Sequence, residues 1–330
     1  MSDEILSMLK SSKTEDRIKA VNRMRRLGGE ERQSLLLLAL QDKSNFVAAM
    51  AAEQLGNEAD WGAMSEMLKR FLWLSGEGLK RDPGCHIRAH LAFAFGRLEY
   101  HAASDAIKIG IRTIQIEAVG GVPFDTGAHL RANCALALAQ LNDRDAVFEI
   151  APLLFDDGSN GVAPLPAKLQ GVSLVRASTR IKAAEALGRT GNQAALVALA
   201  IKLRFPGEEE AQVLQECMQA TVDLGSEHSL SLLAPYLTHF DPGIAAYACL
   251  MLARTRKPEV PELILRCIER LDGDSLQAAI LALASLNDEA SRKFLYRLAE
   301  DPRKEVRQSL LEALRESEIP GDIAFLKSLI

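Results

Sequence analysis

Apolar residues recur along most of this chain in a ten-residue pattern. Counting its first apolar position as zero, apolar or small residues return at +4, +5, +7 and +8. Arg is frequent at +1, Gly at +9, and Asp five positions before the start. Positions 0, +4, +7 and +8 fall on one face of a helix with about 3.6 residues per turn, and small residues there allow close approach. The pattern therefore predicts closely packed amphipathic helices.

The pattern occurs nine times if a degenerate first copy is counted. The copies lie at 17–28, 47–56, 87–96, 130–139, 179–188, 216–225, 244–253, 276–285 and 306–315. Other amphipathic segments separate them, at 30–41, 61–74, 144–155, 192–203, 227–238, 258–271 and 289–300, and 319–330 resembles a closing half-repeat. We therefore expect a first helix (A) and a second helix (B) to alternate about nine times.

This alternation predicts one repeat solenoid over residues 1–330. Residues 1–28 form its degenerate cap, as expected at the end of a repeat array. Residues 58–190 hold loop-rich repeats, and residues 191–330 hold regular ones.

Residues 107–117 fit two interpretations. Their sequence, IKIGIRTIQIE, alternates apolar and polar residues as a strand does. However, Ile107, Ile111, Ile114 and Ala118 also fit one helical stripe. The surrounding repeats favour the helix, so we expect no sheet in this protein.

The recurring segment, seen in TRIKAAEALG at 179–188, resembles HEAT repeats, in particular the short bacterial kind also found in phycobilin lyases. The resemblance covers nearly the whole chain. It implies an all-α fold, an α-α superhelix with B helices on the concave face and A helices on the convex face. It also implies a ladder between repeats, formed by the upstream Asp and the arginines at +1: Arg88, Arg131, Arg180 and Arg307.

Three insertions lengthen the third to fifth repeats, at 75–84, 120–127 and 156–171. All are rich in Gly, Pro and Asp, which predicts loops. Each joins an A helix to the B helix of the same repeat, so we expect the three to lie on one edge. Two interpretations stay open: tolerated surface insertions, or a rim that engages a ligand.

Charge and composition exclude several classes of protein. The net charge of −5 disfavours a general nucleic-acid binder. No apolar run reaches the roughly 20 residues that span a bilayer, and the first ten residues lack the features of a signal peptide. The five cysteines are scattered and form no CxxC pair. We therefore expect buried thiols, a cytoplasmic location and no membrane partner.

Two adjacent repeats carry parallel polar sets at their B helices: His86, Arg88 and His90, then His129, Arg131 and Asn133. The four-residue spacing of His86 and His90 is one that a metal can bridge. However, HEAT-like diiron hydroxylases carry repeated His-Glu pairs, and this sequence contains no His-Glu pair. We therefore expect neither a metal nor a cofactor, and the histidines are either structural or partner-recognising.

The sequence favours a non-enzymatic bacterial scaffold that binds another protein, as a helix or an extended peptide, in the concave groove. Positions +2, +3 and +6 are expected to face that groove: Ala49, Met50, Glu53, Ala89, His90, Phe93, Ala132, Asn133 and Leu136. The candidate partner-binding residues are Met50, His86, His90, Phe93, His129 and Asn133.

Two alternatives remain at this stage, and neither comes with assigned catalytic residues. One is a phycobilin lyase-like enzyme that handles a chromophore. The other is a HEAT-like nucleic-acid binding protein that uses Trp61 and Trp73, although both tryptophans are expected on the convex side.

Overall fold

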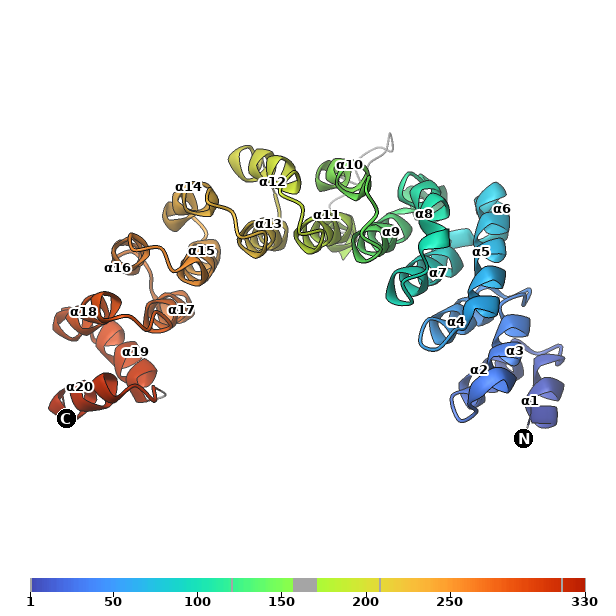
Figure 1. The fold of residues 1–330 in the computed structure, drawn as a ribbon, viewed down its shortest axis with the longest axis horizontal. Coiled ribbons are helices and arrows are strands. Elements are labelled where there is room, and N and C mark those ends of the chain that lie inside the picture. Colours follow the sequence, from blue (N-terminus) through green and yellow to red (C-terminus); the bar gives the residue numbers. More distant parts are fainter. Residues whose placement is uncertain (1, 120, 157–170, 208, 316, 330) are drawn as a thin grey trace. The chain divides into compact units, whose positions relative to one another are not determined.

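The computed structural model describes residues 2–119, 121–156, 171–207, 209–315 and 317–329, and most of these residues are helical (Figure 1). The chain divides into two compact units, Met1–Ala195 and Leu196–Ile330. Each unit has its own stack of helix pairs, so each is described by itself.

The first unit has two layers of helices (Figure 1). The A helices are α1 (Ser2–Leu9), α3 (Gly29–Ala39), α5 (Trp61–Gly76), α8 (Ser104–Ile111) and α10 (Ala146–Ile150), which η3 (Ala151–Phe155) continues. The B helices are α2 (Thr14–Met24), α4 (Asn45–Leu55), α7 (His86–Arg97), α9 (Ala128–Gln140) and α11 (Gly171–Arg189). Each B helix packs on the next, and within this unit the B layer lies on the inner side of the bend.

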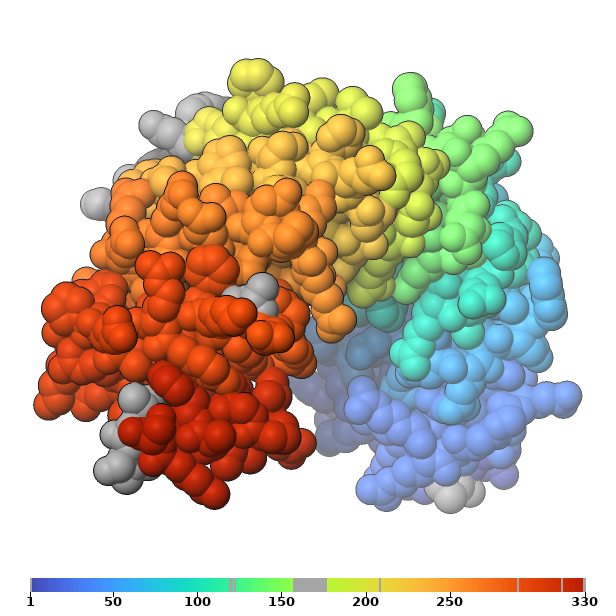
Figure 2. Space-filling view, turned by 60° about the vertical axis from the view of Figure 1, so that its left-hand side comes forward, coloured from blue at the N-terminus to red at the C-terminus, as the bar shows by residue number. Residues whose placement is uncertain are grey.

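The second unit repeats the arrangement. Its A helices are α12 (Ala195–Arg204), α14 (Ser229–Leu233) with η5 (Ala234–Thr238), α16 (Val260–Ile268), and α18 (Glu289–Arg297) with η6 (Leu298–Glu300). Its B helices are α13 (Ala211–Asp223), α15 (Pro242–Thr255), α17 (Gly273–Ala284) and α19 (Lys304–Arg315), and α20 (Pro320–Leu329) packs against α19. Side chains close the spaces that the ribbon leaves between neighbouring helices (Figure 2).

The predicted all-α helical-repeat fold is confirmed, with nine A–B pairs among the described residues. Each of the nine copies overlaps a B helix. The sequence missed α1, whose eight residues bury only Ile5 and Leu9.

The expectation of no sheet is wrong at one place. Residues 107–117 are helical only to Ile111; β1 (Ile116–Val119) then pairs antiparallel with β2 (Val122–Asp125). Gly121 adopts φ 84°, a left-handed conformation that glycine tolerates in the turn between the strands. The strand-like alternation was therefore the correct signal for the end of this segment.

The insertions are more ordered than the predicted loops. In the first, α5 continues to Gly76 and is followed by α6 (Gly78–Arg81) and the 3-10 turn η1 (Pro83–Cys85). The second, 120–127, consists largely of β2. The third, 156–171, lies outside the described residues except at its two ends.

The glycine at +9 is not a left-handed residue after the helix, a common place for glycine. Gly56 has φ −61°, and Gly96 lies inside α7. A Cβ on Gly96 would lie 2.7 Å from the Cα of Ala137 on α9, so this glycine permits close packing of B helices.

The left-handed residue instead lies at +12 in several repeats. The positions concerned are Glu99, Asn142, Gly191 and Arg256, all with positive φ. Gly225 has the same conformation, which places the first position of α13 at Val213 rather than at residue 216. The buried positions of α13 agree with this register, since Val213, Cys217 and Met218 are fully buried.

Candidate partner-binding face

Buried ion pairs lie at the start of the B helices in the third and fourth repeats. In α7, the carboxylate of Asp82 accepts hydrogen bonds from the backbone N–H of Ile87 and Arg88 and from Nε of Arg88, each at 3.0 Å. Both side chains are buried. The second terminal nitrogen of Arg88 donates to Oε1 of Gln115 at 2.6 Å, in the next repeat. This pair therefore connects two repeats.

The same arrangement continues along the unit. Arg131 forms ion pairs with Asp125 at 2.8 Å and with Asp156 at 2.6 Å. Arg180 donates to the backbone carbonyl of Asp156 at 2.8 Å. In the second unit, Arg307 donates to the carbonyl of Asp301 at 2.6 Å. Arg88 and Arg131 thus connect successive repeats, as the resemblance implied, whereas these bonds of Arg180 and Arg307 stay within their own repeats.

The β-hairpin is joined to the first insertion through Glu117. Its Oε1 accepts hydrogen bonds from the Gly84 backbone N–H at 2.7 Å, from Gln115 at 2.6 Å and from Thr126 at 2.5 Å. Burial alone would raise the pKa of Glu117, but these hydrogen bonds to the carboxylate outweigh it and lower the pKa. The first two insertions therefore lie on one edge and contact each other.

Three histidines gather beside this edge, on α7 and α9. His86 and His129 are exposed and His90 is half-buried. Burial lowers the pKa of His90 and of His129, and the neighbouring histidine charges lower both further. The nearest opposing carboxylates are Glu53 of α4 and Asp82. Their surroundings therefore favour the neutral imidazole of His90 and of His129.

Asn133 connects α9 to α7. Its Nδ2 donates to the carbonyl oxygen of Ala89 at 3.0 Å and lies 3.5 Å from Nε2 of His129. Part of this side chain therefore has a structural role, which the sequence did not suggest.

The side chains at positions +3 and +6 of the B helices differ in how much of their surface is exposed. Phe93 is 42% exposed, and Met50 is half-buried. The expectation that +2 faces the groove is wrong, because Ala49, Ala89 and Ala132 are buried, as is Leu136 at +6. The +2 side chain is instead covered where successive B helices pack together.

The two tryptophans belong to α5, in the A layer. Trp61 is 71% exposed and meets Tyr100 edge-on, with ring centroids 5.2 Å apart. Trp73 is 48% exposed, and the guanidinium carbons of Arg70 and Arg81 lie 4.5 Å and 4.1 Å from its ring centroid. These contacts are cation–π interactions, and both tryptophans lie on the side opposite to Phe93.

The histidine cluster does not fit a metal centre. Within the described ranges, no group of three or more His, Cys, Asp or Glu side chains is arranged to hold a metal ion. The carboxylate of Asp82 is held by Arg88, and that of Glu117 by three donors. The Asp82 and Glu117 carboxylates are therefore engaged by the protein's own donors.

All five cysteines are buried and reduced. Burial raises the pKa of Cys85 to about 12, although the nearby Arg88 opposes the shift. Such a thiol stays protonated at neutral pH and is a poor nucleophile. Across the part of the chain that is described, no helix is long and apolar enough to cross a membrane.

Comparisons with known proteins agree with this architecture. Residues 230–315 match the family model described as HEAT repeats. Deoxyhypusine hydroxylase-B of Oryza sativa subsp. japonica is 23% identical over 260 residues, which cover 71% of this chain and 84% of that protein.

The chain is also similar to solved structures. A substituted form of Kap121p has a TM-score of 0.51 and 11% identity, covering 98% of this chain and 37% of its own. The complex of CpcE and CpcF of the phycocyanin lyase from Nostoc has a TM-score of 0.41 and 17% identity, covering 92% of this chain and 97% of that one. The chain is therefore a helical-repeat solenoid that resembles HEAT-repeat proteins.

Proposed function

We propose that this chain is a scaffold that binds another protein, as a helix or an extended peptide, on the B-helix face of the first unit. The observation that carries the proposal is the exposure of Phe93 beside His90 and Met50. A phenylalanine that is 42% exposed on the inner layer of a repeat stack is a suitable anchor for a partner.

The core does not require the Phe93 ring. Packing between α5 and α7 is provided by Phe71 and Phe95, which are fully buried with ring centroids 6.0 Å apart. Phe93 lies on the other side of α7, two residues from Phe95, so its ring is available for a partner.

The groups around Phe93 favour a peptide over a polyanion. Met50 and Asn133 are neutral, and the lowered pKa of His90 and His129 keeps both imidazoles uncharged at neutral pH. Glu53 adds a negative charge on α4. A phosphate backbone would need cationic groups at these positions, whereas a helix or strand needs an apolar anchor with polar neighbours.

The test places a photo-crosslinking phenylalanine analogue at position 93 in the full chain, expressed in its source cells. We expect one discrete crosslinked protein, identified by mass spectrometry. The Phe93→Ala variant should then weaken binding of that purified protein by more than about 1 kcal/mol while its helical circular dichroism spectrum is unchanged.

The matched control carries the same analogue at Lys69, which is exposed on the A layer. If the analogue at Lys69 captures the partner and the one at residue 93 does not, the A helices carry the interaction and the proposal is wrong. An absorbance change on mixing with a bilin, lost in Phe93→Ala, would instead support the lyase-like alternative.

A further inference from the structure

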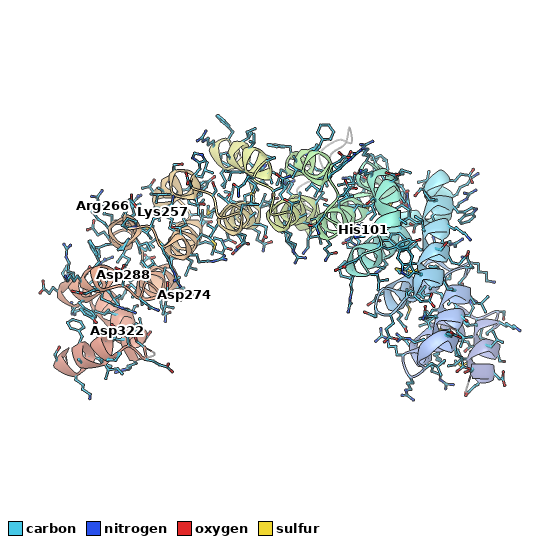
Figure 3. All side chains as sticks on the ribbon, in the orientation of Figure 1. His101, Lys257, Arg266, Asp274, Asp288 and Asp322 are labelled. Carbon is cyan, nitrogen blue, oxygen red and sulfur yellow. The ribbon has the colours of Figure 1, made fainter. Side chains whose placement is uncertain are left out.

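A cavity of about 470 Å³ lies in the second unit, far along the chain from Phe93. It forms between the turn that precedes α16 and the turn that precedes α18. Figure 3 labels one side chain from each turn, Lys257 and Asp288. The lining residues are Arg256, Lys257, Pro258, Pro261, Leu286, Asn287, Asp288, Ser291 and Phe294.

The wall of this cavity is mainly apolar. Pro261 and Leu286 are buried, Phe294 is half-buried, and Pro258 is exposed at the edge. A volume of this size falls within the range of small-molecule sites, about 300–1,000 Å³. The cavity can therefore accept the apolar body of a small ligand.

The charged groups at the rim favour an anion. Arg256 is exposed, and within the described residues its guanidinium has no hydrogen-bond or ion-pair partner. Lys257 donates from Nζ to the carbonyl of Glu227 at 2.5 Å. Asp288 is the one acidic lining residue, and its carboxylate caps α18 by accepting from the backbone and hydroxyl of Ser291. Two cations against one carboxylate leave a net charge of +1.

The backbone gives no reason for an arginine at position 256. Arg256 has φ 52°, at the +12 position that is left-handed after several of the B helices. Equivalent positions hold Gly191 and Asn142, the residue types that tolerate this left-handed conformation. Glu99 is the other residue with a larger side chain there. An arginine thus occupies the mouth of the cavity although the local backbone favours glycine or asparagine.

We propose that this cavity binds a small organic monocarboxylate with an apolar or aromatic body. The carboxylate pairs with the Arg256 guanidinium, which matches its planar geometry with two parallel N–H donors. The body lies against Phe294, Leu286 and the two prolines. This site is separate from the proposed partner-binding face and does not depend on it.

The test titrates the full chain with phenylbutyrate and with octanoate, using calorimetry and ligand-observed NMR. Phenylbutanamide, which has the same body without the charge, is the matched ligand. We expect at least one carboxylate to bind, and the amide to bind about ten-fold more weakly or not at all, because it lacks the charge-assisted bidentate pair.

Arg256→Gly is the decisive variant, because it removes the guanidinium and supplies the residue that the left-handed backbone favours. We expect carboxylate binding to weaken by about ten-fold or more with an unchanged or higher melting temperature, so that loss of folding cannot explain the effect. Phe294→Leu should weaken binding of phenylbutyrate more than binding of octanoate.

Arg266→Gln is the control, since Arg266 is an exposed arginine of α16 that pairs with Glu262 outside the cavity. Its affinity for the carboxylates should equal that of the unmodified chain. The proposal is overturned if neither carboxylate binds, if the amide binds equally well, or if Arg256→Gly binds as tightly as the unmodified chain.

Discussion

The ion pair between Asp82 and Arg88 allows a quantitative test of what holds the third repeat. Asp82→Ala removes the acceptor for two backbone N–H groups of α7 and for Nε of Arg88. Arg88 would keep its hydrogen bond to Gln115 at 2.6 Å but lose its counter-charge in a site where it is almost wholly buried.

The expected cost follows from that burial. Breaking a buried pair by removing one partner costs about 3–5 kcal/mol, because an uncompensated charge remains. Asp82→Asn keeps the shape and one acceptor, so its cost should be about 1.5–3 kcal/mol, the value for hydrogen bonds to a charged group. The double variant Asp82→Ala, Arg88→Met removes the stranded guanidinium and should recover part of the loss.

The assay must resolve one region, because a repeat protein of this length need not unfold in a single step. Hydrogen exchange measured by mass spectrometry reports opening of α7 and of the hairpin separately from the second unit. A loss of about 3–5 kcal/mol raises the exchange of α7 amides by roughly two to three and a half orders of magnitude, at about 1.4 kcal/mol per factor of ten.

An exposed pair sets the reference for this experiment. Arg266→Ala removes the partner of Glu262 on the surface of α16 and should cost less than about 1 kcal/mol. The reasoning is refuted if Asp82→Ala costs no more than Arg266→Ala. It is also refuted if the stability lost by the double variant equals the sum of the losses of Asp82→Ala and Arg88→Met measured singly.

Three further substitutions test other features. Arg180→Ala should lower stability by about 1–3 kcal/mol, measured by thermal denaturation, because it removes the donor to the Asp156 carbonyl; partner capture at residue 93 should persist. Gly96→Ala should cost about 1–3 kcal/mol by urea denaturation, since its Cβ would lie 2.7 Å from the Ala137 Cα, whereas Gly28→Ala, with open space around its Cβ, should not. Cys85 has a pKa raised to about 12, above the unfolded value of about 8.5. The contribution of this thiol to the free energy of unfolding is therefore complete below about pH 8.5 and declines as pH rises toward 12. In urea denaturation, the free energy of unfolding should fall less at alkaline pH for Cys85→Ala than for the unmodified chain.

The sequence predicted the fold because its signal repeats. Alanine at +4 and apolar residues at +8 recur on one helical face. Stacked B helices bury this face in every copy of the pattern. The hairpin at 116–125 was missed because the repeat context outweighed a local alternation of four residues. The helix α1 was missed because two buried side chains, Ile5 and Leu9, are too few to define a period.

The surface residues were only partly predictable. The exposure of Phe93 follows from its place on the helix, opposite the core positions of α7. The burial of Ala49, Ala89 and Ala132 does not, because it depends on how closely the next repeat packs. The electrostatic interaction between His90 and His129 likewise requires two repeats, 39 residues apart along the chain, to be stacked in register.

The cavity of the second unit could not be read from the sequence. Its lining comes from two turns about thirty residues apart, and no residue of either turn is unusual in type. Only the left-handed conformation of Arg256 distinguishes it from other surface arginines, and the residue type alone does not predict that conformation.

The ion pairs of Arg131 with two aspartates also affect how such a gene can change over time. Repeat proteins commonly gain or lose whole units, since each unit contacts only its neighbours. Here Asp125 lies in the same repeat as Arg131, whereas Asp156 lies in the next one, where Arg180 also contacts its backbone. Deleting or duplicating one of these repeats would leave a buried charge unmatched at the junction. We therefore expect this stretch to be inherited as a block of fixed length, with gains and losses of repeats confined to other parts of the array.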